Sequence, residues 1–279
     1  MITVLIPTWN GATELPALLD ALDSQTAAHG RIAIDSSSSD STRELLQSRG
    51  FRVERIEQSA FGHGSTRNAL VHLAQTEFLV FFSQDAQPQG SDFLERLVEA
   101  LRRNPRAEGV SARVLPREDD DPLTARSVLS APEAAARALS GEAAAAAFHN
   151  VAAAYRREAL LRRPFPQIPF GEDQAWARAV VAGAGEVLFE PAVAVRHSHR
   201  YSLQELYQRY RVDARFHRSV RGVRLRPDLL SLLRGLAFEL REDWRFPGRT
   251  PRSLLRAPLH RAAQLLGQYR GSRGPLGAD

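Results

Sequence analysis

The sequence contains no cysteine, no lysine and only one methionine in 279 residues. The absence of cysteine excludes disulfide bonds and thiolate metal sites, and it allows a reducing compartment. No apolar run approaches the ~20 residues that a membrane-spanning helix needs. The opening MITVLIPTWN lacks a basic segment followed by a long apolar one, so it predicts a strand and not a signal peptide.

The rest of the composition is that of an ordinary globular protein, with 43% hydrophobic and 25% charged residues. Such a composition excludes wholesale disorder and collagen-like or coiled-coil repeats. The length is sufficient for one large domain, or for a domain with an appendage.

All 37 basic residues are arginine, and they are unevenly distributed. Residues 196–279 hold 18 arginines against 7 acidic residues, a net charge of +11, whereas residues 1–195 carry −6. A basic C-terminal segment indicates an anionic partner such as membrane phospholipid, nucleic acid or a phosphorylated substrate. The alternative is a solvated arginine-rich surface that reflects biased base composition, which the absence of lysine favours.

Short apolar runs alternate with segments of helical spacing through the first half of the chain. The predicted strands are residues 2–7, 31–35, 51–56, 78–82, 109–114 and 187–196. The predicted helices are residues 14–22, 40–49, 65–74, 92–103 and the segment from 202 onward. This alternation predicts an α/β fold with a mostly parallel central sheet that is flanked by helices on both faces.

The remaining segments are less regular. Residues 116–125 predict a turn-rich loop, and the alanine-rich residues 131–147 predict a helical excursion, with an acceptor lid as the alternative. Residues 247–279 contain prolines and a Gly/Ser/Arg tail, which predict a linker or frayed helix. We therefore expect a catalytic domain over 1–201 and a basic, mostly helical extension over 202–279.

Polar residues follow three of the predicted strands, at the carboxyl ends where ligands of such sheets bind. Asp35 and the four serines after it suit a nucleoside, because a carboxylate accepts hydrogen bonds from a base N–H or a ribose hydroxyl. The alternative is a serine-rich loop that caps a helix. The chain has neither a GxGxxG nor a GxxxxGK[ST] motif, so a dinucleotide fingerprint and a P-loop are unsupported.

The segment FGHGSTRN, residues 61–68, combines glycines with His63 and Arg67 ahead of a predicted helix. Glycines let the backbone approach a ligand closely, and the free N–H groups of a helix start can donate hydrogen bonds to a phosphate. The alternative is a plain helix N-terminus capped by Ser65 or Thr66.

Three further segments carry carboxylates or histidines. Asp85 follows the apolar strand 78–82 and is placed for a divalent cation, although a turn residue is the alternative. Glu172 and Asp173 stand at a predicted helix start, where they provide either a general base or simple N-terminal helix charge. His197 and His199 directly follow the last predicted strand, and we expect at most one of them to join a given metal site.

Taken in order, these segments resemble the family 2 glycosyltransferases of the GT-A fold, and among them bacterial rhamnosyltransferase-like members. The likeness covers about residues 1–215. The matching segments are VLIPTWN at 4–10, DSSSSD at 35–40, GSTRN at 64–68, SQDA at 83–86, GEDQAW at 171–176 and VRHSH at 195–199.

The resemblance implies a role for each matching residue. The implied donor-binding residues are Pro7, Thr8, Asn10, Asp35, Ser37, His63, Arg67, Ser83 and Gln84. Asp85 matches the last carboxylate of the family's DxD motif and would hold Mg²⁺ or Mn²⁺ on the pyrophosphate, with His197 completing the metal shell and His199 as the fallback. Asp173, beside Glu172, matches the catalytic base. Ser83 departs from the pattern, because it stands where the motif usually has its first aspartate.

The implied reaction is inverting transfer of a sugar, with rhamnose as a candidate, from a nucleotide-diphosphate donor to a hydroxyl of a glycan or lipid-linked acceptor. The product would belong to a polysaccharide or glycolipid. The resemblance also implies a cytoplasmic enzyme, with peripheral contact to an anionic inner membrane face as a further expectation. No nucleic-acid partner is expected, and a homo-oligomer is allowed.

Two other function classes fit parts of the sequence. A sugar-nucleotide pyrophosphorylase uses a related sheet, but it would have a glycine-rich loop with a basic residue where this chain has Thr8-Trp9-Asn10-Gly11. A non-catalytic nucleotide-binding or nucleic-acid-binding module would use the basic tail. The presence of Asp85 and of the Glu172-Asp173 pair disfavours this second alternative.

Overall fold

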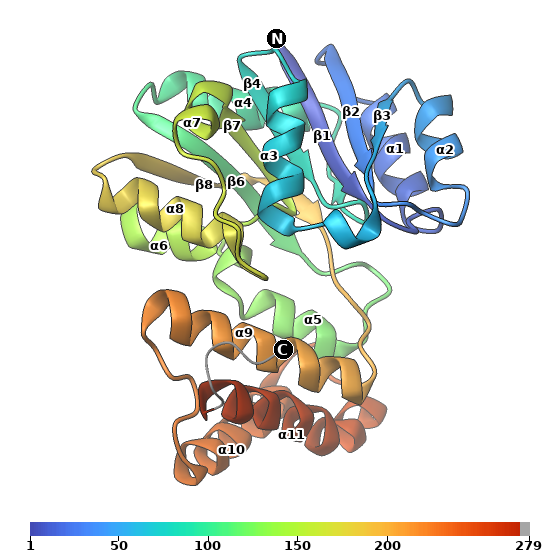
Figure 1. Cartoon of the computed structure of the whole chain (residues 1–279). Helices are drawn as coiled ribbons and strands as arrows, with labels where there is room; N and C mark the ends of the chain where they lie inside the picture. The colour runs from blue at the N-terminus through green and yellow to red at the C-terminus, as the bar shows by residue number, and fades with distance from the viewer. Residues whose placement is uncertain (274–279) are drawn as a thin grey trace. The chain divides into compact units, whose positions relative to one another are not determined.

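A computed structural model describes residues 1–273 and divides the chain into two compact units (Figure 1). The first unit comprises Met1–Leu115 and Ala131–His197, and the second comprises Pro116–Ser130 and the residues from Ser198 onward. The segment 116–130 therefore belongs with the C-terminal helices, which the sequence did not indicate. Residues 274–279, the end of the expected linker, lie outside the described residues.

The first unit is built around one eight-stranded sheet. Its strands are β1 (Ile2–Thr8), β2 (His29–Asp35), β3 (Arg52–Arg55), β4 (Phe78–Phe82), β5 (Gln87–Pro88), β6 (Ala107–Leu115), β7 (Ala152–Arg156) and β8 (Glu186–Arg196). Its helices are α1 (Leu15–Asp23), α2 (Thr42–Ser48), α3 (His63–Leu73), α4 (Phe93–Arg103), α6 (Gly141–Ala147), α7 (Arg157–Arg162) and α8 (Glu172–Ala182), with single 3₁₀ turns η1 (Gln58–Ala60) and η2 (Pro132–Ala134).

The strand order is β3-β2-β1-β4-β7-β6-β8-β5. Strands β1, β2, β3 and β4 pair in parallel, as do β6 and β8. Strand β7 is antiparallel to both β4 and β6, and β5 is antiparallel to β8. The prediction of a mostly parallel sheet is confirmed, whereas β7 is a strand that the sequence analysis did not predict.

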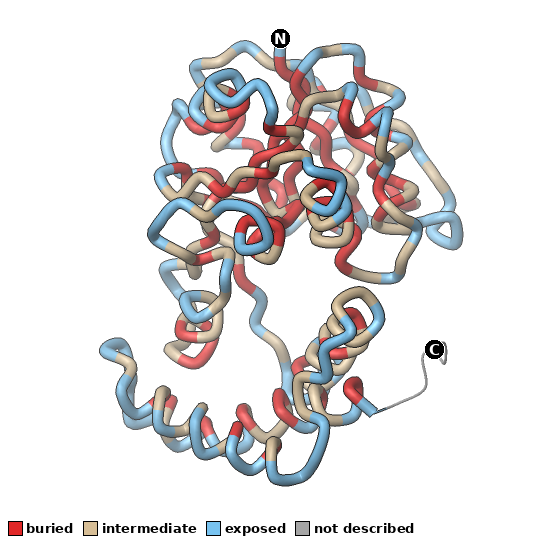
Figure 2. The backbone as a smooth tube through the Cα atoms, turned by 90° about the vertical axis from the view of Figure 1, so that its left-hand side faces the viewer, coloured by how far each residue is buried: buried red, intermediate tan, exposed pale blue. Residues whose placement is uncertain are grey.

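Helices cover both faces of the sheet. Successive side chains of a strand point to opposite faces, so an apolar strand such as β4 presents apolar side chains to both layers of helices. On β4, the Phe81 ring packs edge-on against Tyr155, and the Phe82 ring lies 5.7 Å from Phe93 of α4. The core on the Phe81 side also includes residues of α3, α6, α7 and α8. In Figure 2 the buried segments, in red, gather in the interior of the unit that contains the N-terminus.

The alanine-rich segment 131–147 is helical only in part. Residues 132–134 form a single 3₁₀ turn, and α6 begins at Gly141, which has a left-handed φ of 53°. Pro132 and the left-handed backbone at Gly141 interrupt the continuous helix that the composition predicts.

The second unit is helical. It contains α5 (Pro122–Leu129), α9 (Leu203–Arg221), α10 (Leu229–Arg245) and α11 (Pro251–Arg273). The prediction of a loop over 116–125 is wrong from residue 122 onward, because Asp121 caps α5 and Pro122 occupies its first position. The prediction of a linker or frayed helix over 247–279 is wrong for residues 251–273, which form one helix despite Pro258.

A buried ionic network holds α5, α10 and α11 together. Arg261 is fully buried, and its Nη2 and Nε donate to the two carboxylate oxygens of Asp243 at 2.7 and 2.9 Å. Arg126 of α5 reaches the same carboxylate at 2.5 Å. Because an unpaired buried charge is strongly unfavourable, each member requires the others in this arrangement.

Candidate active site

The carboxyl ends of β1 and β2 lie side by side, since Thr8 is paired in register with Asp35. Asp35 is fully buried, and its Oδ2 and Oδ1 accept hydrogen bonds from the backbone N–H and the hydroxyl of Ser38 at 3.0 and 2.5 Å. The Thr8 hydroxyl lies 3.5 Å from Asp35 Oδ1. These bonds fix the loop after β2 against the end of β1.

Two residues at this edge of the sheet have a left-handed backbone conformation, which residues other than glycine rarely adopt. Asn10, three residues beyond the half-buried Pro7, has a φ of 44°, and Ser37 has a φ of 60°. The Asn10 side chain accepts a hydrogen bond from the Ser39 N–H at 2.9 Å, and the Ser37 hydroxyl donates to the Ile56 carbonyl at 2.8 Å. Such conformations persist where surrounding bonds hold them, and they cluster at functional sites.

The residues after β4 are tied to both neighbouring strands. Gln84 accepts a hydrogen bond from the Trp9 N–H at 3.0 Å and donates to the Trp9 carbonyl at 3.2 Å. A Cβ at Gly11 would lie 2.8 Å from the Gln84 side chain, so a larger residue there would displace the end of that side chain. The Ser83 N–H donates to the Val151 carbonyl, just before β7, at 3.1 Å.

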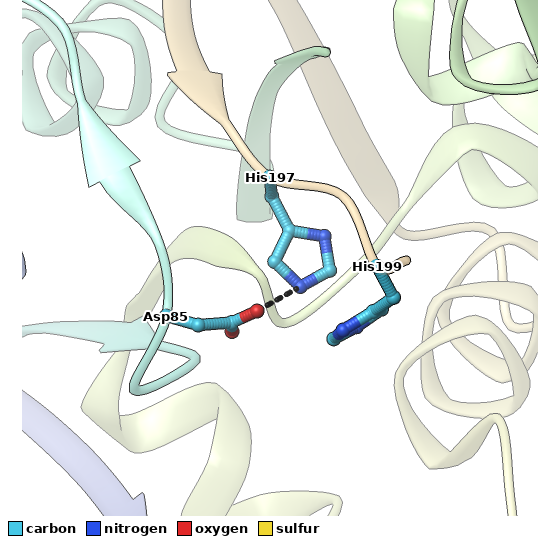
Figure 3. A group of neighbouring side chains, drawn as sticks. All are labelled: Asp85, His197 and His199. Carbon is cyan, nitrogen blue, oxygen red and sulfur yellow. Dashed lines mark ion pairs between the residues drawn. The ribbon is translucent and has the colours of Figure 1, made fainter. Parts of the chain in front are cut away.

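A carboxylate and two imidazoles form a group that could hold a metal ion (Figure 3). The pairing of β5 with β8 places Gln87 opposite Arg196 and so brings Asp85 next to His197. Asp85 is mostly buried, and its Oδ2 lies 3.3 Å from His197 Nε2. With His199 included, one potential ligand atom from each residue lies within 4.8 Å of the others.

The expectation that at most one of the two histidines joins a given metal site is wrong in geometric terms. Strand β8 ends at Arg196, and residues two apart on an extended chain lie on the same side of it. Both His197 and His199 therefore present a ring nitrogen to the neighbourhood of Asp85. A carboxylate with imidazoles suits Mn²⁺ better than Mg²⁺, which prefers a shell of oxygen atoms alone.

A second cluster forms around the start of α8, which follows Gly171 with its left-handed φ of 78°. Glu172 is buried, and its Oε1 lies 3.1 Å from Arg67 Nη1. The same Oε1 accepts a hydrogen bond from Asn150 Nδ2, also at 3.1 Å. The Tyr155 hydroxyl in turn donates to Asn150 Oδ1 at 2.6 Å, which fixes the orientation of this amide.

Asp173 shares this cluster but has different surroundings. Its Oδ2 accepts from the Asn150 N–H at 2.8 Å, and its Oδ1 accepts from the Gln174 N–H at 2.7 Å. Burial and the neighbouring charge of Glu172 raise the pKa of Asp173 to about 7, against the opposing effect of these N–H groups and Arg67. The residue as a whole is half-buried. A carboxylate of this kind exchanges a proton near neutral pH.

Helix α3 begins at His63 and not at Ser65, and Gly62 occupies its N-cap position. The His63 ring packs against Phe61 at 5.1 Å. Arg67, on the next turn, is buried against Glu172, so the structure brings it to the carboxylate pair. A Cβ at Gly64 would lie 2.3 Å from the Pro166 carbonyl, so a glycine is required for this close approach.

Sequence reasoning missed Asn150 and Tyr155, which contact the carboxylate pair. Strand β7 runs antiparallel to β4 with Ala152 opposite Phe82, so residues just before β7 lie beside those just after β4. The available signal was a polar His149-Asn150 pair directly before the apolar run 151–155.

Comparison of the sequence with known proteins identifies the family of the chain. Residues 3–163 match the model of glycosyl transferase family 2. The O-antigen chain rhamnosyltransferase RfbN of Salmonella typhimurium is 31% identical over 227 residues, which cover 77% of this chain and 72% of that protein. WbaN of Salmonella anatum, another O-antigen chain rhamnosyltransferase, is 32% identical over 77% of this chain and 71% of its own length.

Solved structures share the fold at lower identity. The mannosyltransferase PcManGT of Pyrobaculum calidifontis, solved with GDP-Man and Mn²⁺, is 20% identical, covers 97% of this chain and 85% of its own, and has a TM-score of 0.61. Glucosyl-3-phosphoglycerate synthase of Mycobacterium tuberculosis is 20% identical, covers 82% of this chain and 81% of its own, and has a TM-score of 0.57. The fold is therefore of the GT-A type, and the chain belongs to glycosyl transferase family 2.

Proposed function

We propose that this glycosyltransferase transfers a sugar, with inversion, from a nucleoside-diphosphate donor to a hydroxyl of a glycan or lipid-linked acceptor in polysaccharide synthesis. The likeness to two O-antigen chain rhamnosyltransferases supports rhamnose as the sugar. The observation that carries the proposal is Asp173, a half-buried carboxylate with a pKa of about 7, in the unit that also holds the Asp85–His197 pair.

The donor nucleotide is proposed to bind at the carboxyl ends of β1, β2 and β4. The loop after β2 is held in place by Asp35, and the turn after β4 is held against β1 by Gln84. The left-handed backbone at Asn10 and Ser37 shapes the same edge. We assign Pro7, Thr8, Ser83 and His63 to this region as well, as the resemblance implies.

Asp85, His197 and His199 are proposed to hold Mn²⁺, with Mg²⁺ as the other candidate ion. A divalent cation on the pyrophosphate offsets the negative charge that develops on the leaving group. The near-burial of Asp85 strengthens its interaction with a cation, since fewer water molecules screen the charge.

Asp173 is proposed to accept the proton of the acceptor hydroxyl as that oxygen attacks the sugar. The backbone N–H groups of Asn150 and Gln174 orient its carboxylate. A positioned general base of this type contributes about 10²–10⁴ to the rate. Glu172 is bound to Arg67 and Asn150, so we assign it to positioning the pair and raising the pKa of Asp173.

We further propose that the protein acts in the cytoplasm, with peripheral contact to an anionic inner membrane face. None of the helices within residues 1–273 is both long and apolar enough to cross a bilayer. Helices α10 and α11 leave large apolar side chains exposed, among them Leu229, Leu233, Trp244, Leu255 and Leu259. Apolar side chains interspersed with arginines are typical of helices that lie on anionic lipid.

A screen of nucleoside-diphosphate sugars by thermal shift, with Mn²⁺ and with EDTA, tests the proposed donor site. A ligand that binds only the folded state raises the melting temperature, and we expect this rise to require both the diphosphate and Mn²⁺. The Asp85→Asn variant should lose the Mn²⁺-dependent part of the rise while it keeps the fold. Equal shifts in the variant and the wild type would contradict the proposed metal site.

A further inference from the structure

The helical unit contains a cavity of its own, with a volume of about 320 Å³. Arg252, Arg256 and His260 line it from one face of α11, where positions four residues apart are neighbours. Arg200 lines the same cavity, so that the four basic side chains converge there. All of these residues belong to the second unit, and none was assigned to the sugar-transfer site.

Two carboxylates also line the cavity, but both are bound to other groups. Asp119 forms an ion pair with Arg200 at 2.5 Å. Asp121 caps α5, where it accepts hydrogen bonds from the Leu123 N–H at 3.0 Å and the Thr124 hydroxyl at 2.8 Å. The Asp119–Arg200 ion pair lies in the cavity lining itself, so Arg200 adds no net positive charge there, and the hydrogen bonds of Asp121 occupy its carboxylate oxygens.

The guanidinium groups of Arg252 and Arg256 are not neutralised in this way. Among residues 1–273, no carboxylate oxygen lies within 4.0 Å of either group, and both side chains are exposed. Helices α5 and α11 also begin at the cavity, which is lined by Pro122 and Ser253 from their first turns. The positive ends of their dipoles add to the charge of the two arginines.

We propose that this cavity binds a phosphate or pyrophosphate group. Arginine binds phosphate oxygens through two parallel N–H bonds, which makes it the preferred side chain for this ligand. The volume is at the lower end of small-molecule sites, and it suits a phosphate group with few further atoms. The inference does not depend on the proposed sugar transfer, because every residue used lies in the helical unit.

His260 provides a local reporter for this site. Burial and the charges of Arg261 and Arg256 lower the pKa of His260 to about 4, against the opposing effect of Asp121 and Asp243. His260 is therefore neutral at pH 7 and could donate a hydrogen bond to a phosphate oxygen. An anion in the cavity would favour the protonated ring and raise this pKa.

Calorimetric titration of the full chain with inorganic pyrophosphate, in EDTA at low salt, tests the proposal directly. The double variant Arg252→Gln/Arg256→Gln should bind at least tenfold more weakly than the wild type. Arg241→Gln removes an exposed arginine of α10 that does not line the cavity, and it should bind as the wild type does. In the wild type, pyrophosphate should shift the His260 ring signals in NMR spectra and raise the pKa of His260.

Two outcomes would overturn the proposal. Either the double variant binds pyrophosphate as tightly as the wild type, or saturating pyrophosphate leaves the His260 signals unchanged. In both cases the anion would bind elsewhere on the chain.

Vesicles distinguish a free phosphate from one carried by a lipid. Preference for phosphatidic acid over phosphatidylserine at equal surface charge, lost in the double variant, supports a lipid-borne phosphomonoester. Pyrophosphate binding without that preference supports a free ligand. A preference for phosphatidic acid that the double variant retains would contradict the assignment to this cavity.

Discussion

Asp173 is a carboxylate of the candidate site whose pKa is raised to near neutral pH. Its pKa of about 7 lies above the ordinary value of 3.8, so between about pH 4 and pH 7 the folded chain retains a proton that the unfolded chain has lost. The free energy of unfolding must therefore fall as the pH rises through this window. The same raised pKa makes the ionised group a stronger base.

This linkage predicts that Asp173→Asn is more stable than the wild type at pH 8, by about 1–3 kcal/mol, because the variant buries no charge at this position. Below pH 4 the wild-type carboxyl is protonated as well, so the difference should largely disappear. Urea unfolding at both pH values measures the effect. A constant difference between the two proteins at all pH values would show that Asp173 does not titrate in this range.

Replacement of Glu172 is expected to change the pH dependence of the reaction. The charge of Glu172 raises the pKa of Asp173, whereas Arg67 lowers it, so Glu172→Gln should lower this pKa and shift the acidic limb of the rate profile to lower pH. Loss of the partner of a buried arginine should also destabilise the fold, by about 3–5 kcal/mol.

Tyr155→Phe provides a control for general damage to this cluster. It removes one hydrogen bond to Asn150 and leaves the charge of Glu172 in place. We expect it to lose about 1 kcal/mol of stability without the same shift in the rate profile. Equal shifts in both variants would exclude a specific effect of the Glu172 charge.

Individual residues of the candidate site could be predicted from the sequence, but the contacts between distant segments could not. Asp35, Asp85 and Gln84 were found because strand ends are visible as the ends of apolar runs. The contact of Arg67 with Glu172 spans more than 100 residues and depends on the packing of α3 against the start of α8. Local sequence patterns do not predict a contact between residues so far apart in the chain.

At the scale of elements, three of the missed features were missed for different reasons. Three of the five residues of strand β7 are alanine, and its pairing between β4 and β6 outweighs the low strand propensity of that residue. Helix α5 has the Asp121-Pro122 start signal, but it lies in a segment whose charges and prolines predicted a loop. Helix α11 contains Pro258, and it persists because its inner face packs on α9.

The packing of α11 on α9 depends on two glycines spaced four residues apart. A Cβ at Gly271 would lie 2.2 Å from the Arg211 carbonyl, and one at Gly267 would lie 2.4 Å from the Tyr207 carbonyl. Gly271→Ala should therefore force the helices apart and destabilise the helical unit, by about 1–3 kcal/mol. Thermal unfolding followed by circular dichroism measures the loss.

Leu266→Ala is the matched control in the same helix, because this side chain is exposed. It should change the melting temperature only slightly. If Gly271→Ala had the same melting temperature as Leu266→Ala and the wild type, the close approach of α9 and α11 would be contradicted.

At the scale of the whole molecule, charge and exposed apolar surface occur together in the C-terminal part of the chain. Residues 196–279 carry a net charge of +11, and Trp244 and Leu229 on α10 are 65% and 61% exposed. Positions 229, 233 and 244 lie on one side of that helix, since they are separated by four and eleven residues. This pattern supports the proposed contact with an anionic membrane.

We expect the triple variant Leu229→Ser/Leu233→Ser/Trp244→Ser to bind anionic vesicles at least tenfold more weakly than the wild type in co-sedimentation. Leu161→Ser, which changes an exposed apolar residue of the first unit, is the control and should bind normally. Salt should weaken the wild-type interaction, because part of it is electrostatic. Failure of the wild type to bind anionic vesicles at low salt would exclude a lipid contact.

The most direct measurement is the rate of sugar transfer by Asp173→Asn, compared with the wild type at pH 7.5 and saturating Mn²⁺ and donor. Because the asparagine cannot accept the acceptor proton, we predict a rate lower by about 10²–10⁴, with donor affinity in the same preparation within a factor of three. Transfer by Asp173→Asn at a rate close to that of the wild type would contradict the assignment of Asp173 as the general base.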